Sequence, residues 1–357
     1  MSNVMTLPGS PTQIEFGFQQ AREFILDPFY QHPVLTLFHT IEQNVVAKKQ
    51  LAYLGLFGKS GIADTTCGGS GSQTLTASEK FWDPAPIRDR YEQCWNDIEP
   101  SLLVYAQKAG IDRKNLEMNP LFIRFISPLI RDNIVDNYLR RVWFSDTTYT
   151  SGDFTNGATD LPYYNTYNGF WQQIFAAVTA GDAYRSTITE NAASTAAAQL
   201  TLGATTAYDA LKDLYTNGDT RILEQNDAMI LMTKSMFDNY TTYMESQSFN
   251  FTLDVLKDGF GNTVTRSTSF RGVPVYEVRF WDRWIQGDFL TGSPAVYDAP
   301  NRVLMTTKRN LAAGLDNTRS LSNFDSWYER KDQKWYADYG TVEDAKTIHD
   351  FMIAAAY

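Results

Sequence analysis

Cysteine and histidine are scarce in this sequence, which has two cysteines and three histidines among 357 residues. Two cysteines cannot build a framework of several disulfides, so we expect Cys67 and Cys94 to be reduced thiols of a protein made in a cytosol. The histidines, His32, His39 and His349, belong to no HExxH motif and to no cysteine-rich cluster. The sequence therefore predicts no metal site and gives no support to a cysteine–histidine nucleophile pair.

Long apolar runs and basic clusters are also missing. No stretch reaches the roughly 18 apolar residues that a membrane span needs. The first residues, MSNVMTLPGSPTQIEFGF, lack the basic and apolar segments of a signal peptide. Lysine and arginine total 31 against 41 acidic residues, which gives a net charge of −10. This balance disfavours a protein that grips nucleic acid through a basic surface, but it allows one that encloses nucleic acid.

One glycine-rich stretch, GLFGKSGIADTTCGGSGS (55–72), contains Gly58-Lys59-Ser60, the last three residues of a phosphate-binding loop. The full motif needs an earlier glycine where this chain has Tyr53, and it needs a helix directly after the serine. Four glycines follow Ser60 by residue 71, and each disfavours a helix by about 1 kcal/mol relative to alanine. We therefore expect no nucleotide site, and we interpret the stretch as the tip of a β-hairpin.

The N-terminal quarter of the chain reads as an arm followed by a hairpin. Residues 1–45 predict an extended arm with a helix near Gln13–Leu26, between proline pairs that limit its ends. Residues 46–96 predict a long two-stranded excursion that carries the glycine-rich stretch at its tip. Its rising strand is VVAKKQLAYLGLF, and its returning strand is FWDPAPIRDRYEQCW.

The strongest helical pattern lies in NPLFIRFISPLIRDNIVDNYLRRVWF, after a shorter helix expected between Asp97 and Gly110. Apolar residues recur four apart, at Phe122, Ile126, Ile130, Ile134, Tyr138 and Val142. The charged residues are expected on the other faces, Arg141 among them, with an i,i+4 pair between Asp136 and Arg140. Ser127-Pro128 is either a kink or a restart. A helix from Pro128 would be about 25 Å long, and one that includes the preceding segment about 10 Å longer.

The rest of the chain predicts a mixed α/β region. Helices are expected at Gly169–Ala180, Thr206–Leu214 and Lys234–Glu245, and a hairpin is expected in FNFTLDVLKDGFGNTVTRSTSF. VPVYEVRFW and RVLMTT predict core strands. The end of the chain, DSWYERKDQKWYADYG and TIHDFMIAAAY, predicts further strands, with a helix as the alternative for the last segment.

Catalytic signatures are absent from the sequence. It has no GxSxG elbow and no GxGxxG fingerprint. The carboxylate pairs Asp132/Asp136 and Asp209/Asp213 are typical of solvated helix faces, and DGFGN lacks the alternating oxygen ligands of a calcium loop. We therefore predict no enzyme activity and no cofactor.

The order of these elements resembles the Hong Kong 97-type major capsid protein of tailed bacteriophages. The resemblance lies in the excursion from Val45 to Trp95, the long helix FIRFISPLIRDNIVDNYLRRVWF, and the late block SFRGVPVYEVRFWDRWI with PNRVLMTTKRNLAAGLDN. It implies an α+β fold with five parts. They are an N-terminal arm (1–45), an E-loop (46–96), a P-domain around a spine helix (97–165), an A-domain (166–320) and C-terminal strands that return to the P-domain (321–357).

This resemblance implies a structural protein that assembles with copies of itself. Hexamers and pentamers would form an icosahedral virion head, made in the host cytoplasm, around double-stranded DNA that is enclosed without specific binding. Portal, scaffolding or decoration proteins would be further partners, and no membrane would be. The E-loop tip would contact a neighbouring subunit through Gly58, Lys59, Ser60, Gly68, Gly69 and Gly71.

Two further features of such proteins bear on this sequence. Some members cross-link an E-loop lysine to an asparagine, and Lys59 with Asn310 or Asn317 would be the residues here. No motif supports that reaction, so we expect non-covalent assembly. The start of the sequence has no long basic or helical extension, and we expect no fused scaffolding segment unless one was cleaved before residue 1.

Two other functions remain open at this point. An encapsulin-like shell subunit would share the fold but enclose protein cargo, which co-purification would reveal. A carbohydrate-active enzyme would also carry many aromatic residues, which make up 14% of the chain, but it would need a pocket with converging carboxylates. The shell interpretation is favoured because large aromatic contacts suit subunit interfaces, and because an arm and a hairpin are costly to order without a neighbour.

Overall fold

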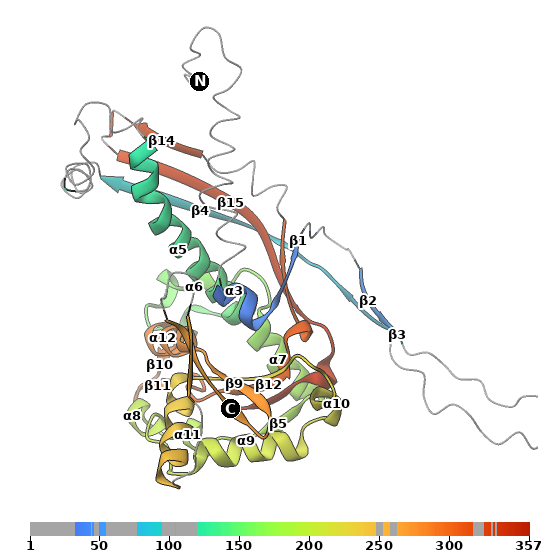
Figure 1. The fold of residues 1–357 in the computed structure, drawn as a ribbon. Helices are drawn as coiled ribbons and strands as arrows, with labels where there is room; N and C mark the ends of the chain where they lie inside the picture. Colours follow the sequence, from blue (N-terminus) through green and yellow to red (C-terminus); the bar gives the residue numbers. More distant parts are fainter. Residues whose placement is uncertain are drawn as a thin grey trace, which may run out of the picture.

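The computed structural model describes residues 33–43, 45, 50–54, 77–94, 104, 120–247, 253–257, 263–316, 325–329, 331–332 and 334–357. In this part of the chain, a body of helices around one sheet adjoins a second sheet crossed by a long helix (Figure 1). The expected helix at Gln13–Leu26 and the glycine-rich stretch at 55–72 lie outside the described residues, as does the helix expected at 97–110 apart from the helical residue Val104.

The longest strand, β15 (Lys334–Thr347), organises a five-stranded sheet. One of its edges pairs antiparallel with β4 (Ala85–Cys94) over ten residues, from Lys334↔Cys94 to Glu343↔Ala85. The other edge pairs first with β14 (Asp325–Glu329) and then with β13 (Leu311–Leu315), and β1 (Thr40–Gln43) adds parallel to β13. FWDPAPIRDRYEQCW was expected to return along the excursion, but its β4 part pairs with a strand some 250 residues away.

The second sheet has seven strands in the order β5-β16-β12-β6-β9-β8-β7. Its strands are β5 (Tyr184–Ser186), β16 (Ala354–Ala356), β12 (Val303–Thr307), β6 (Ala228–Met232), β9 (Val273–Glu277), β8 (Thr263–Phe270) and β7 (Asp254–Lys257). All five residues of β12 and four of the five in β6 are buried, as expected for strands covered on both faces. The last strand of the chain, β16, belongs to this sheet, where it pairs with β12. β16 follows residue 320 and pairs with a strand before it, and β13 precedes residue 320 and pairs with β15 after it.

Helices occupy most of the predicted positions around these sheets. The long ones are α7 (Phe170–Ala180), α9 (Thr206–Asn217), α11 (Lys234–Ser246) and α12 (Arg279–Asp288), and the first three confirm the predicted helices. VPVYEVRFW was expected to be one strand, but the strand ends at Glu277 and the rest begins α12. Short elements are α3 (Pro33–Phe38), η3 (Ser151–Asp153), η4 (Gly157–Thr159), α6 (Leu161–Tyr164), η5 (Thr189–Ala192), α8 (Ala196–Gln199), α10 (Thr220–Leu223), β10 (Leu290–Thr291), β11 (Val296–Tyr297), η6 (Lys308–Asn310) and η7 (Asp350–Met352).

The long helix, α5, runs without a break from Pro120 to Phe144. At about 1.5 Å per residue it is about 37 Å long, so Pro128 lies within one helix and starts no second one. The apolar stripe is confirmed from Ile130 onwards, because Ile130, Ile134, Tyr138 and Val142 are all buried. The side chains of Phe122 and Ile126 lie outside the described part of the structure.

Two predictions about the charged faces of α5 were wrong. Arg141 is buried, at 2% exposure, although we expected it on a charged face outside the apolar stripe. Asp136 forms its ion pair with Arg283 of α12 and not with Arg140. Arg140 instead lies over the rings of three aromatic residues, Tyr163, Tyr164 and Trp284. For both Asp136 and Arg140, partners distant in the sequence replace the predicted local pair.

An aromatic cluster joins α5 to the helices of the body. The Trp143 ring of α5 lies 4.9 Å from Phe170 and 4.8 Å from Trp281, and Trp281 lies 5.0 Å from Trp171. These edge-to-face contacts add to the stability that the buried area provides. The same core contains residues of both sheets, so α5, α7 and α12 tie the two sheets into one body.

Part of the predicted N-terminal arm belongs to this core. Leu35, Phe38 and His39 of residues 33–39 are buried, and β1 continues directly into the five-stranded sheet. The described residues of the arm are therefore integral to the body. His39 is fully buried beside Phe170, with its ring centroid 6.1 Å away, and burial, reinforced by Lys308, lowers the pKa of His39 to about 3.

We predict that His39 makes stability depend on pH. Its pKa rises from about 3 in the folded chain to its usual 6.5 on unfolding, so the unfolded state gains a proton as the pH falls below 6.5. The stability that neutral His39 provides is complete above pH 6.5 and declines on acidification, by on the order of 3 kcal/mol at pH 4.

His39→Phe should flatten this dependence, as measured by denaturant unfolding between pH 7 and pH 4. His349→Phe is the control, because His349 is only partly buried and its replacement should change the slope less. Equal slopes for the wild type and His39→Phe would contradict the assignment.

Candidate functional site

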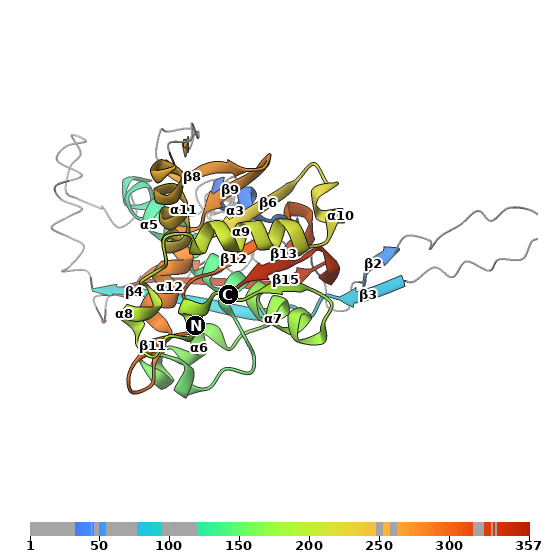
Figure 2. The same cartoon turned by 90° about the horizontal axis from the view of Figure 1, so that it is seen from below.

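A two-stranded ribbon, β2 (Gln50–Leu54) and β3 (Ala77–Phe81), extends from the body. These strands pair antiparallel from Gln50↔Phe81 to Leu54↔Ala77, and within the described residues they join no other sheet. Figures 1 and 2 both show the ribbon extending away from the body. An isolated pair of strands is at best marginally stable in water, so this ribbon suits a contact with another molecule.

The predicted contact residues Gly58, Lys59, Ser60, Gly68, Gly69 and Gly71 fall between β2 and β3, outside the described residues. Their role stays a prediction. The structure describes the two strands that flank this segment, and at their body end, opposite Gln50, Phe81 is 48% exposed. Phe81 is a large exposed apolar residue of a ribbon whose two strands pair only with each other among the described residues. Such a residue is typical of an interaction surface.

The ribbon is anchored to the body at Trp82. This side chain is 1% exposed and packs with Val45 and Ala312, the latter in β13. A Cβ atom added to Gly314 would lie 2.7 Å from Trp82 Cζ3 and 2.8 Å from Val45 Cγ2. Only glycine leaves room for the indole ring at this point.

Polar contacts also hold the root of the ribbon, by which we mean residues 80–83, where it joins the body. Lys80 Nζ donates to Asp350 Oδ1 at 2.6 Å and to the Thr347 carbonyl at 2.8 Å. The backbone N–H of Asp83 donates to Asp344 Oδ2 at 2.7 Å. Charge-assisted hydrogen bonds of this kind are the strong ones, so the direction in which the ribbon leaves the body is set by both packing and charge.

A buried ion pair secures the sheet from which the ribbon emerges. Arg141 of α5 donates from Nε and Nη2 to the two carboxylate oxygens of Glu343 in β15, at 2.8 and 2.7 Å. Asp89 of β4 lies 3.6 Å from Arg141 Nη1, and Tyr167 donates to Glu343 at 3.4 Å. The two principal side chains are 3% and 1% exposed.

The charges of this cluster stabilise each other and hold α5 against β15. Burial alone would lower the pKa of Arg141, but the Glu343 carboxylate raises it overall, so Arg141 stays charged. Burial raises the pKa of Glu343 and Arg141 opposes that rise. Because each charged group is the hydrogen-bond partner of the other, the cluster offers no open position to a substrate. No pattern in the sequence indicated this ion pair, because Glu343 lies 202 residues from Arg141.

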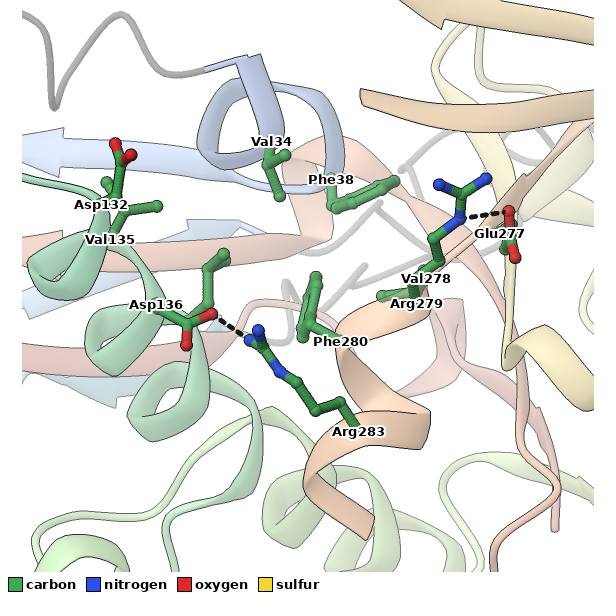
Figure 3. A pocket seen from close by; sticks show the side chains of 11 residues that line it. Val34, Phe38, Asp132, Val135, Asp136, Glu277, Val278, Arg279, Phe280 and Arg283 are labelled. Carbon is green, nitrogen blue, oxygen red and sulfur yellow. Dashed lines mark hydrogen bonds and ion pairs between the residues drawn. The ribbon is translucent and has the colours of Figure 1, made fainter. Parts of the chain in front are cut away.

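A groove between α3, α5 and α12 has a volume of about 300 Å³ (Figure 3). Its carboxylates are engaged, because Asp132 pairs with Arg131, Asp136 with Arg283, and Glu277 with Arg266 and Arg279. Among the described residues, no group of three or more histidine, cysteine, aspartate or glutamate side chains could hold a metal ion, and no helix could span a membrane. Cys94 is a free, partly exposed thiol, whereas Cys67 lies outside the described part of the chain.

Comparisons with known proteins give a structural likeness without sequence similarity. No family model matches this sequence, and no curated protein does. A chain of the structure described as "Satellite phage P4 procapsid including size determination (Sid) protein" matches with a TM-score of 0.50 and 9% identity, over 96% of this chain and 98% of that chain.

Two further solved structures match less well. One is described as "Gordonia phage Cozz", with a TM-score of 0.47 and 10% identity over 91% of this chain and 85% of that one. The other is described as "Capsid of native GTA particle computed with C5 symmetry", with a TM-score of 0.46 and 10% identity over 100% of this chain and 94% of that one. The likeness to the P4 procapsid chain shows a shared fold, and the predicted α+β fold of Hong Kong 97 type is confirmed.

We predict that Gly314→Ala destabilises the root of the ribbon. The new methyl group would collide with Trp82 and Val45, and overpacking of this kind typically costs about 1–3 kcal/mol. Denaturant unfolding of the purified subunit would measure the loss.

Gly287→Ala is the matched control. It adds the same methyl group in α12, where a Cβ meets nothing within 4 Å, so its stability should be unchanged or slightly higher. If the two variants were equally stable, the tight packing at the root would be disproved.

Proposed function

We propose that this chain is a major capsid protein, a structural subunit that assembles with copies of itself into the shell of a phage head. The observation that carries the proposal is the fold shared with a chain of the P4 procapsid over nearly the full length of both chains. Because sequence identity is only 9%, the likeness concerns fold, and the function rests on how the features of this chain suit such a shell.

The parts of the fold take roles in this proposal. The β2–β3 ribbon with the segment between its strands is the E-loop, and α5 with the five-stranded sheet is the P-domain. The seven-stranded sheet with its helices is the A-domain. The ribbon supports the proposal most directly, because β2 and β3 pair with no other described strand and would gain stability from a neighbouring subunit.

The chemistry of the chain suits enclosure of DNA. A net charge of −10 would limit adhesion of DNA to the inner wall of a shell. The proposed particle has hexamers and pentamers, contains double-stranded DNA and assembles non-covalently in the host cytoplasm. Portal, scaffolding or decoration proteins are further proposed partners. The subunit itself is proposed to have no enzymatic role, since the carboxylates of its described groove serve ion pairs.

An encapsulin-like compartment is the alternative within the same fold. No feature of the described residues favours a protein cargo over DNA. Analysis of what co-purifies with assembled particles separates the two: nuclease-protected DNA is expected, and a stoichiometric protein cargo in its place would favour the compartment.

We predict that deletion of Gly61–Gly71 spares folding and prevents normal shell assembly. Loop closure changes by only about 0.6 kcal/mol per doubling of loop length, so a shorter connection between β2 and β3 should cost the subunit little. The shortened ribbon would no longer reach its neighbour. Sedimentation velocity and light scattering measure assembly, and circular dichroism reports folding.

Lys59→Ala is the control that keeps the ribbon at full length, and it should assemble normally. It should also bind no nucleotide, like the unmodified chain. Particles of unchanged size from the deletion variant would refute the contact role, and an insoluble deletion variant would assign the segment to the core.

A further inference from the structure

The groove between α3, α5 and α12 has an apolar floor and two charged rims. Figure 3 shows Val34 and Phe38 of α3 facing Phe280 of α12 across it. Val135 and Leu139 of α5 and Val278 complete the apolar lining. The rings of Phe38 and Phe280 are 6.4 Å apart and tilted by 51°. Their faces and edges suit contact with another aromatic ring.

The two rims carry opposite charges. Asp132 and Asp136 come from α5, whereas Arg279 and Arg283 come from α12. One ion pair, Asp136–Arg283, spans the groove. Arg279 is 47% exposed while its Nε donates to Glu277 at 2.9 Å. An occupant with a ring and a hydroxyl group could stack on the floor, lie beside a guanidinium and donate to a carboxylate.

The size of the groove favours a side chain over a substrate. Pockets for small molecules hold about 300–1,000 Å³ and have a few convergent polar groups, and this groove is at the lower limit. Its charged residues already serve the ion pairs described above. A volume of about 300 Å³ has room for one large aromatic side chain and part of a second.

The chain itself approaches the groove at its α3 wall. Pro33 is the first residue of α3, and the adjacent Val34 lines the groove. Residues 1–32 precede this wall and include Phe29 and Tyr30, four and three residues before Pro33. A short tether gives such residues an effective concentration of the order of millimolar at the groove, more than a separate molecule would reach.

We propose that the groove is the docking site of the aromatic pair Phe29–Tyr30 of the same chain. One ring packs against the Phe38–Phe280 pair, and the Tyr30 hydroxyl donates to a carboxylate of the α5 rim. The contact fixes the point at which the N-terminal segment leaves the body. It goes beyond the proposed function, because it forms within one chain and requires no assembled shell.

Site-specific photo-cross-linking of the full-length chain tests this contact. A p-benzoylphenylalanine replaces Phe29 in one variant and Tyr30 in another, and mass spectrometry identifies the cross-linked peptides. A mixture of ¹⁴N- and ¹⁵N-labelled chains separates contacts within a chain from contacts between chains. The expected result is a cross-link to residues 132–139 or 278–283 of the same chain. Cross-links that join light and heavy chains, or that lie outside the groove, would overturn the proposal.

A matched pair of variants controls for general effects. Val34→Glu places a charge in the groove and should abolish the cross-link. Leu253→Glu changes an apolar side chain that is 43% exposed, directly before β7, and should leave the cross-link intact. If Val34→Glu does not fold, Arg279→Glu replaces it and should lower the cross-link yield by up to about fivefold. Equal yields in groove and control variants would disprove the site. Sedimentation records assembly separately, so the docking contact and the shell function can fail independently.

Discussion

The buried ion pair between Arg141 and Glu343 is the constraint on which the arrangement of this fold depends. Removing two charges from water costs several kcal/mol each, and only excellent geometry offsets that cost. Here the guanidinium makes two hydrogen bonds of 2.7 and 2.8 Å with one carboxylate, and Asp89 and Tyr167 surround the pair. The spine helix α5 is thereby held at one angle to β15 and β4.

Strand β4, whose Asp89 lies beside Arg141, connects this ion pair to the point where the ribbon leaves the body. Strand β3 of the ribbon is followed by the buried Trp82 and then by β4. Strand β4 pairs with β15 over ten residues. A body fixed by a charge pair and by aromatic packing thus presents two strands that, among the described residues, pair only with each other. A packed body with an extension that joins no other described sheet is the form expected of a subunit that its neighbour completes.

Local patterns predicted helices well and failed where distant residues meet. The four-residue spacing from Ile130 to Val142 gave the buried face of α5, because burial there follows the helical period. The same reasoning placed Arg141 on a charged face outside the buried stripe, since its partner Glu343 cannot be recognised from spacing. Strand β4 was assigned to the excursion for the same reason: alternation indicates a strand and does not identify its neighbour. The contact residues at the ribbon tip remain a prediction from sequence.

The central claim is that neighbouring subunits complete this fold in a closed shell. Electron cryomicroscopy of particles formed by the full-length chain tests it most directly. We expect icosahedral shells in which the ribbon formed by β2 and β3 lies against an adjacent subunit, and in which Arg141 and Glu343 remain paired within each subunit. A chain that stays monomeric at every concentration and salt condition, or particles whose ribbons contact only their own subunit, would contradict it.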